Sequence, residues 1–221
     1  MKRWGCALLM LGAASVEAAA FKATLLVLDD DPRLQRSRIE RAYLGHPTGP
    51  AADAVAVAIK ESKLELDAVG ASLSIATVSA ADVKGLQDAA RKAEKAGDVA
   101  LLADLPADAL LAVADAVKLP VLNLSATDDR LRQQDCRAQL WHVAPSERMR
   151  ADALAQTLVA RKWSTVLLLT GPSPADAQRS AVAQAALKRY GLKLAGAKPF
   201  KLSGTARARL GQRHLADPRQ P

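Results

Sequence analysis

Aromatic residues are scarce, at only 3% of the 221 residues, although half of the chain is hydrophobic. Proteins that stack nucleic-acid bases or sugar rings on aromatic faces need more such side chains, so the composition argues against both classes. A core built from Ala, Leu and Val fits helices packed on parallel strands. The length suits one or two domains.

Cysteine is sparse, with two residues, and catalytic motifs are missing. Cys6 lies in a leader that we expect to be removed, so Cys136 is left alone and no intrachain disulfide is predicted. There is no Gly-rich phosphate-binding loop, no H-E-x-x-H pattern and no G-x-S-x-G nucleophile elbow. The three histidines are far apart, and we interpret His142 as structural. We therefore expect no cofactor, no metal site and no catalysis.

Half of the net charge of +8 lies at the two ends of the chain. Residues 1–20 carry +1 and residues 205–221 carry +3, which leaves +4 on residues 21–204. In that middle part basic and acidic residues alternate, whereas a nucleic-acid-binding protein has a basic stripe. A mildly basic solvated surface is predicted, with no nucleic-acid partner.

Residues 1–20 have the layout of a secretory signal peptide: a basic start, an apolar stretch and small residues at the end. Cleavage is expected before Phe21, with Ala19 as the second choice and a buried N-terminal helix as the alternative. The stretch is shorter than the roughly 20 apolar residues of a membrane helix, and Cys6 precedes it, which argues against a lipoprotein anchor. A periplasmic protein without membrane insertion is predicted.

Apolar runs then alternate with helical patterns, which is typical of βαβ units around a parallel sheet. Ser79 is expected to cap a helix that ends at Gly97, and Pro106 to start the next helix. The expected strands are 23–28, 72–78, 98–102, 120–124, 139–143, 165–170 and 192–200, and the expected helices are 51–65, 80–96, 106–117, 147–162 and 175–190, with a helical turn near 34–43.

Four strands followed by three predict two successive α/β layers. We expect a signal peptide at 1–20, an N-terminal lobe at 21–144, a partial second lobe at 145–204 and an irregular tail at 205–221. Residues 29–31 (DDD) resemble the acidic cluster of a phosphorelay receiver, but the matching acid and lysine lie too far along the chain. An exposed loop is predicted there.

The most specific pattern covers residues 120–204, which include PVLNLSATDDRLRQQDCRAQLWHVAPS and VLLLTGPSPADAQRSA. This segment resembles periplasmic binding proteins of the branched-chain amino acid (type I) ABC transporters. Within that group it is most similar to the binding component associated with PQQ-dependent alcohol oxidation, and the similarity extends over about residues 21–204. The resemblance implies two Rossmann-like lobes with a small ligand between them, and an inner-membrane ABC permease as partner.

The resemblance also implies the ligand-binding loops, which follow the third, fourth and sixth strands. The residue types depart from the family at the third-strand loop, where hydroxyl residues are usual, and at the sixth-strand loop, where an aromatic residue is usual. An amino acid is therefore a poor match, and an alcohol, an aldehyde, a short organic acid or a quinone-linked metabolite is expected. The matching positions are Leu105, Pro106, Ser125, Ala126, Thr127, Pro172 and Ser173.

Two alternatives stay open: an exported α/β hydrolase or transferase that uses Ser125 or Cys136, and a sensor lobe of a receptor. The regular alternation ends near Gly204, and residues 205–221 are Arg-rich without an amphipathic period. This break predicts a C-terminally truncated binding protein with an incomplete second lobe. Such a chain should bind ligand weakly, because a two-lobed trap needs both walls.

Overall fold

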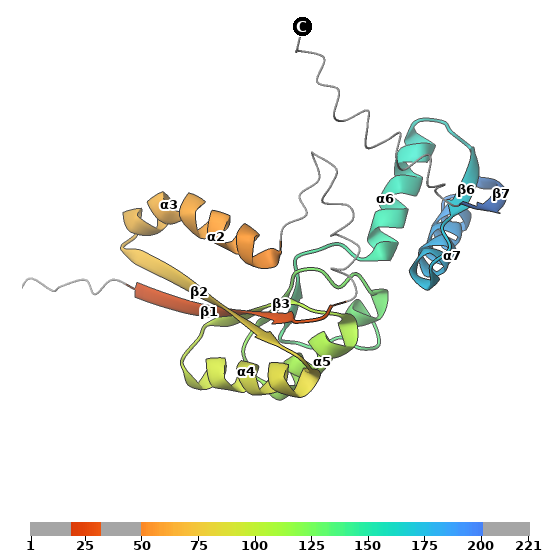
Figure 1. Ribbon diagram of the computed structural model, residues 1–221. Helices are drawn as coiled ribbons and strands as arrows, with labels where there is room; N and C mark the ends of the chain where they lie inside the picture. The colour runs from red at the N-terminus through yellow and green to blue at the C-terminus, as the bar shows by residue number, and fades with distance from the viewer. Residues whose placement is uncertain (1–18, 32–49, 201–221) are drawn as a thin grey trace, which may run out of the picture.

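The computed structural model describes residues 19–31 and 50–200, which form an α/β structure (Figure 1). The expected helical turn near 34–43 and the tail at 205–221 lie outside these residues. The larger sheet has five parallel strands in the order β2-β1-β3-β4-β5. Its strands are β1 (Ala19–Leu28), β2 (Ala71–Ala80), β3 (Ala100–Asp104), β4 (Val121–Asn123) and β5 (Leu140–His142).

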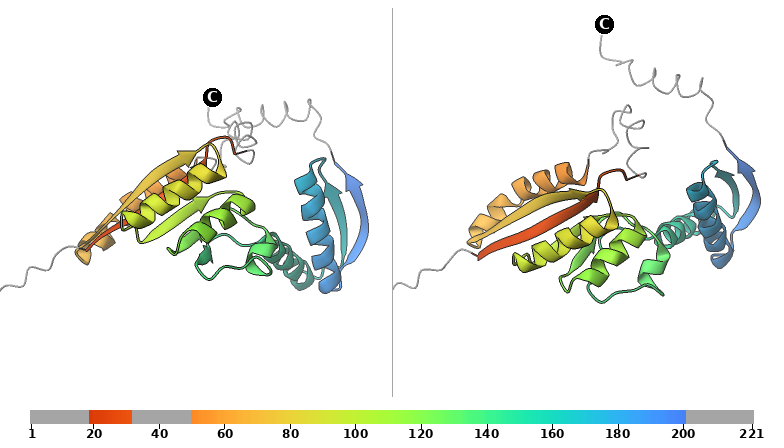
Figure 2. Two further views of the ribbon diagram at one scale, coloured as in Figure 1. Left: turned by 90° about the horizontal axis from the view of Figure 1, so that it is seen from below. Right: turned by 60° about the horizontal axis from the view of Figure 1, so that its bottom comes forward.

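Helices cover both faces of this sheet (Figures 1 and 2). α4 (Val83–Lys95) and α5 (Ala107–Ala116) pack on one face, and α2 (Ala51–Glu61) and α3 (Lys63–Ala68) lie on the other. One long helix was predicted for the second pair, but the chain breaks at Ser62. The parallel crossovers place the ends of β3 and β4, which carry two of the candidate loops, at the same edge of this sheet.

The hydrophobic core lies between the sheet and the pair α4 and α5. Apolar side chains of β1, β3, β4, α4 and α5 are fully buried there, whereas none of the residues of α2 and α3 is buried. The amphipathic pattern of α4 explains this, because its apolar positions recur every three or four residues. The core includes Leu26, Leu86, Leu101, Leu110, Val113 and Val121.

Two polar side chains enter this core together. Thr24 Oγ1 donates a 2.6 Å hydrogen bond to Asp98 Oδ2, and the two residues are 6% and 9% exposed. A buried carboxylate needs such a partner, because it has lost its contact with water. The pair joins β1 to the turn before β3.

The helix caps differ partly from the predicted ones. Ser79 lies within β2, so its prediction as a cap is wrong, and Asp82 caps α4 by accepting the Gly85 amide at 2.7 Å. The strand continues two residues further than its apolar alternation indicated, and the cap moves with it. Gly97 ends the helical segment with φ +82°, as predicted, because glycine adopts this conformation without strain. Pro106 also precedes α5 as predicted.

A second, smaller sheet consists of the parallel strands β6 (Thr165–Thr170) and β7 (Lys193–Pro199). It is accompanied by α6 (Glu147–Ala160) and α7 (Pro174–Arg189). The predicted grouping of four and three strands is wrong: β5 pairs with β4 through Leu140 and Val121, so the described strands divide into five and two. The short β5 completes the first sheet before the chain crosses over.

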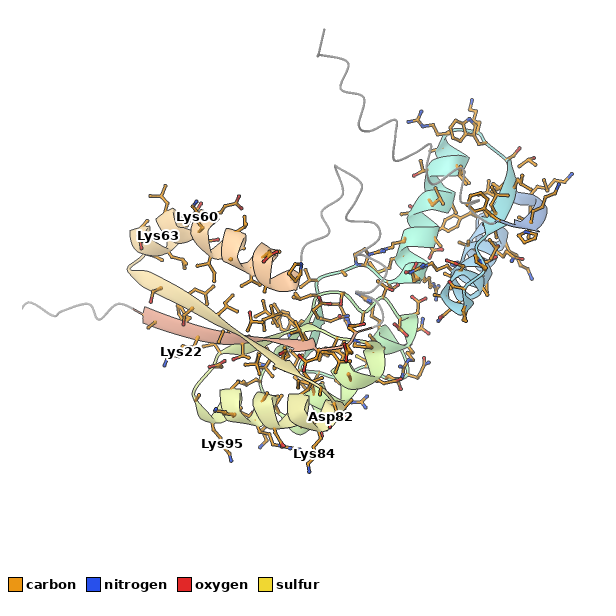
Figure 3. The ribbon with its side chains drawn as sticks, in the orientation of Figure 1. Lys22, Lys60, Lys63, Asp82, Lys84 and Lys95 are labelled. Carbon is orange, nitrogen blue, oxygen red and sulfur yellow. The ribbon has the colours of Figure 1, made fainter. Side chains whose placement is uncertain are left out.

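An exposed loop was predicted for the acidic run after β1, but only part of this run is exposed. Asp29 and Asp30 are exposed, but Asp31 is only 2% exposed. Basic residues lie elsewhere: Figure 3 shows Lys60 and Lys63 on the helices of one face and Lys84 and Lys95 on the helix of the other. These charges sit on opposite sides of the sheet, so they form no single basic stripe.

Within the described residues, no helix is both long and apolar enough to cross a membrane.

Candidate functional site

The loops that follow β3 and β4 meet at the C-terminal edge of the larger sheet. Ala103 and Asn123 are register partners in these neighbouring strands. Beyond them, Ser125 Oγ donates a 2.5 Å hydrogen bond to Asp104 Oδ1. The two loops therefore lie at one edge of the sheet, and the ligand contacts of their residues stay predictions.

Asn123 organises the loop after β4, and sequence reasoning did not select it. Its side chain is fully buried, and its Oδ1 accepts the backbone amides of Ser125 at 3.2 Å and Ala126 at 2.8 Å. Its Nδ2 donates to the Ala126 carbonyl at 2.7 Å. An asparagine at the end of an apolar strand, two residues before Ser125, is the signal that was available, because Asn commonly bonds to backbone two residues on.

The same amide nitrogen of Asn123 lies 3.0 Å from Nδ1 of His142. The amide nitrogen can only donate, so Nδ1 accepts and the imidazole proton resides on Nε2. Burial lowers the pKa of His142, and the positive charge of Arg132 lowers it further. A hydrogen bond to the Leu131 backbone raises this pKa, but the lowering effects are larger. The neutral imidazole of His142 thus supports the buried Asn123 amide, which agrees with the structural role that the sequence indicated.

The predicted ligand residues of the first lobe fall into two groups. Leu105 and Ala126 are 0% and 4% exposed and belong to the hydrophobic core. Their side chains are therefore occupied by packing, and the backbone amide and carbonyl of Ala126 are both bonded to the Asn123 side chain. Pro106, Ser125 and Thr127 are half-buried at the strand edge.

Thr127 connects the first lobe to the start of α6. Its carbonyl accepts the Glu147 backbone amide at 2.9 Å, and its Oγ1 donates to Glu147 Oε1 at 3.1 Å. Beside it, Ser146 Oγ donates to Asp129 Oδ1 at 2.5 Å and accepts the Met149 amide as the N-cap of α6. These bonds hold the first turn of α6 against the loop after β4.

A cavity of about 170 Å³ lies at this junction. One wall is the loop after β4 and the start of α6, and the other wall is α7. Arg179 of α7 lies 3.5 Å from Glu147 Oε1 and 3.6 Å from Asp176 Oδ1. The described lining residues are Thr127, Asp128, Asp129, Glu147, Ala175, Gln178, Arg179 and Val182.

Pro172 and Ser173 do not line this cavity. Ser173 Oγ accepts the Asp176 amide at 3.1 Å and Asp176 Oδ2 accepts the Ser173 amide at 3.1 Å, which makes a capping box for α7. The Ser173 hydroxyl also donates to Asp176 Oδ2 at 2.6 Å. The hydroxyl that was expected to bind ligand is therefore used to begin the helix. The second wall comes from Gln178 and Arg179, which no sequence motif indicated.

The two candidates for chemistry are Ser125, in the loop after β4, and Cys136, which precedes β5. Ser125 pairs with a carboxylate, and Cys136 is an exposed free thiol. The described residues contain no group of three or more His, Cys, Asp or Glu side chains that could hold a metal ion.

No protein-family model matches this sequence, and no curated protein matches it. Solved structures do match, at low sequence identity. An ABC transporter substrate-binding protein from Desulfitobacterium hafniense in complex with Leu is 14% identical with a TM-score of 0.54, and 89% of this chain covers 56% of that chain. A leucine-, isoleucine-, valine-, threonine- and alanine-binding protein from Brucella ovis in its closed conformation is 14% identical with a TM-score of 0.57, and 84% of this chain covers 48% of that chain.

A third similar structure is a solute-binding protein of an ABC transporter from Rhodopseudomonas palustris BisB5 in complex with 3,4-dihydroxybenzoic acid. It is 12% identical with a TM-score of 0.52, and 84% of this chain covers 48% of that chain. The chain thus spans about half the length of these structures. At these identities the likeness shows the fold, and over that span the protein has the α/β architecture of the type I periplasmic-binding-protein fold.

Proposed function

We propose that this protein binds a small organic solute, without catalysis, as the solute-binding part of an ABC importer. The observation that carries the proposal is the cavity between the loop after β4 and α7, at the C-terminal ends of parallel strands. Open α/β sheets bind ligands at this edge, because loops and helix N-termini there offer polar groups. The names of the structurally similar proteins favour a binding role over an enzymatic one.

The proposed division is an N-terminal lobe to residue 144 and a second lobe from residue 145. The proposed contacts are Thr127, Ser125 and Pro106, which are half-buried at the strand edge, whereas the buried Leu105 and Ala126 shape the two loops that carry them. Pro172 and Ser173 remain proposed contacts only if a bound solute reaches past α7. The link to PQQ-dependent alcohol oxidation rests on the sequence resemblance alone.

Export to the periplasm and docking on an inner-membrane permease are parts of the same proposal. β1 begins at Ala19, which pairs with Ala71. Cleavage before Ala19 leaves that strand whole, whereas cleavage before Phe21 removes its two exposed first residues. The intact mass of the periplasmic form distinguishes the two positions.

Amide chemical shifts of the isotopically labelled 221-residue chain test the binding role, since they detect weak binding and locate it. Short alcohols, organic acids and amines are added one at a time. A binding solute should shift the amides of Thr127, Glu147 and Gln178 together and leave the solute chemically unchanged. Consumption of the solute would favour the enzyme alternative.

The Thr127→Ala variant tests the contact itself. Loss of a hydroxyl that pairs with the solute should weaken binding by about 1 to 3 kcal/mol. Thr157→Ala is the matched control, because Thr157 is exposed on α6 and its hydroxyl bonds only to the Ala153 carbonyl among the described residues. Equal affinities of the two variants would reject Thr127 as a contact.

A further inference from the structure

The cavity between the two lobes has a charge that the sequence did not indicate. Leu105 and Pro106 led to the expectation of a weakly polar site. The described lining instead contains the carboxylates of Asp128, Asp129 and Glu147 and the guanidinium of Arg179, which gives a formal charge of −2. We propose that this cavity selects a small protonated amine and rejects carboxylates, an inference that rests on the proposed solute-binding function.

Each carboxylate at the cavity keeps acceptor capacity after its bonds within the protein. Glu147 receives one hydrogen bond from Thr127 and has Arg179 at 3.5 Å, and Asp129 receives one from Ser146. Asp128 lies 3.9 Å from Arg130, beyond hydrogen-bond distance. A carboxylate has about four acceptor positions, so an ammonium group can be accepted without breaking these bonds.

The only cation among the described lining residues is already shared. Arg179 lies between Glu147 and Asp176, and its side chain is 55% exposed. An incoming carboxylate would have to displace one of these acids and would face the remaining like charges. An incoming ammonium group meets an excess of negative charge, and this favours its entry and its binding.

The size of the cavity limits the ligand. A volume of about 170 Å³ corresponds to about six molecules of liquid water, at about 30 Å³ each. This admits a molecule of a few non-hydrogen atoms, with room for a hydroxyl group beside Thr127 or Gln178. A short amino alcohol or diamine fits this description.

Three probes of nearly equal size separate charge from shape: ethanolamine, ethylene glycol and glycolate. All carry a hydroxyl, and they bear a positive, zero and negative charge. Ethanolamine should shift the amides of Thr127, Glu147 and Gln178 at concentrations at which glycolate does not. The affinity for ethanolamine should fall with added salt, because screening weakens the attraction.

Variants of opposite charge sharpen the test. Glu147→Gln keeps an acceptor for Thr127 and should weaken ethanolamine binding by about tenfold, at the lower end for a hydrogen bond to a charged group. Arg179→Gln makes the cavity more negative and should strengthen ethanolamine binding. Asp115→Asn removes one charge outside the cavity, on the exposed carboxylate that binds Arg137, and should have no effect.

The outcomes separate this inference from the proposed function. Binding of glycolate or ethylene glycol at the same amides, with no preference for ethanolamine, would overturn the amine selectivity and leave the solute-binding role. Equal effects of the Glu147 and Asp115 variants would also overturn it. If none of the solutes tested binds, both proposals are overturned.

Discussion

Nδ2 of Asn123 and Nδ1 of His142 lie 3.0 Å apart, and this contact joins the last two strands of the larger sheet just below the candidate site. The amide also holds the Ser125 and Ala126 backbone through its oxygen. One fully buried side chain thus fixes both the loop after β4 and the edge strand β5.

Replacement of Asn123 by Ala should lower the free energy of unfolding by about 3 kcal/mol, because buried backbone amides lose their acceptor. Chemical denaturation measures the change. Gln133→Ala is the control: Gln133 is exposed, and its loss should change stability by less than about 0.5 kcal/mol. A similar small change in both variants would contradict the organising role of Asn123.

Stability should fall as the pH drops below about 6.5, the ordinary pKa of histidine. Burial lowers the pKa of His142 in the folded state, so between the two pKa values the unfolded chain binds a proton that the folded chain does not. The stability that the neutral imidazole provides is present above about 6.5 and is lost as the pH falls through the lower, folded value.

His142→Gln should flatten this dependence, since Gln does not titrate. Thermal melts of both proteins between neutral and mildly acidic pH give the difference. His46 and His214 are present in both chains and cancel in the comparison. Parallel curves for the two proteins would show that His142 does not cause the pH dependence.

Thr24→Val should destabilise the protein by about 1 to 3 kcal/mol, because the nearly isosteric side chain leaves the buried Asp98 carboxylate without its 2.6 Å donor. The double variant Thr24→Val with Asp98→Asn should recover part of the loss, since a neutral amide is less costly to bury. Urea unfolding measures both. A double variant less stable than Thr24→Val would contradict this reading.

Asp82→Ala should cost about 1 kcal/mol, the usual contribution of an N-cap. Ser79→Ala should cost less than about 0.5 kcal/mol, because Ser79 is exposed within β2. The two variants separate the observed cap from the one expected from the sequence. The reverse order of effects in chemical denaturation would place the cap at Ser79 after all.

Local patterns determined most of the fold. The apolar run at Thr165–Thr170 predicted β6 residue for residue, and Gly97 and Pro106 mark their helix boundaries correctly. These signals are local, because a strand needs only its own side-chain pattern and a helix boundary depends on backbone preference at one residue. The shift of the α4 cap from Ser79 to Asp82 arose because both residue types accept backbone amides equally well.

The residue pattern along the chain accounts for the alternation of strands and helices, and therefore for the edge at which the loop of Ser125 and Thr127 lies. The partners that this loop meets are evident only in the tertiary structure. It assigned β5 to the first sheet through Leu140, used Ser173 as a helix cap and brought Arg179 to Glu147, 32 residues away. Those contacts depend on how two packed units sit together, and no spacing along the chain encodes that distance.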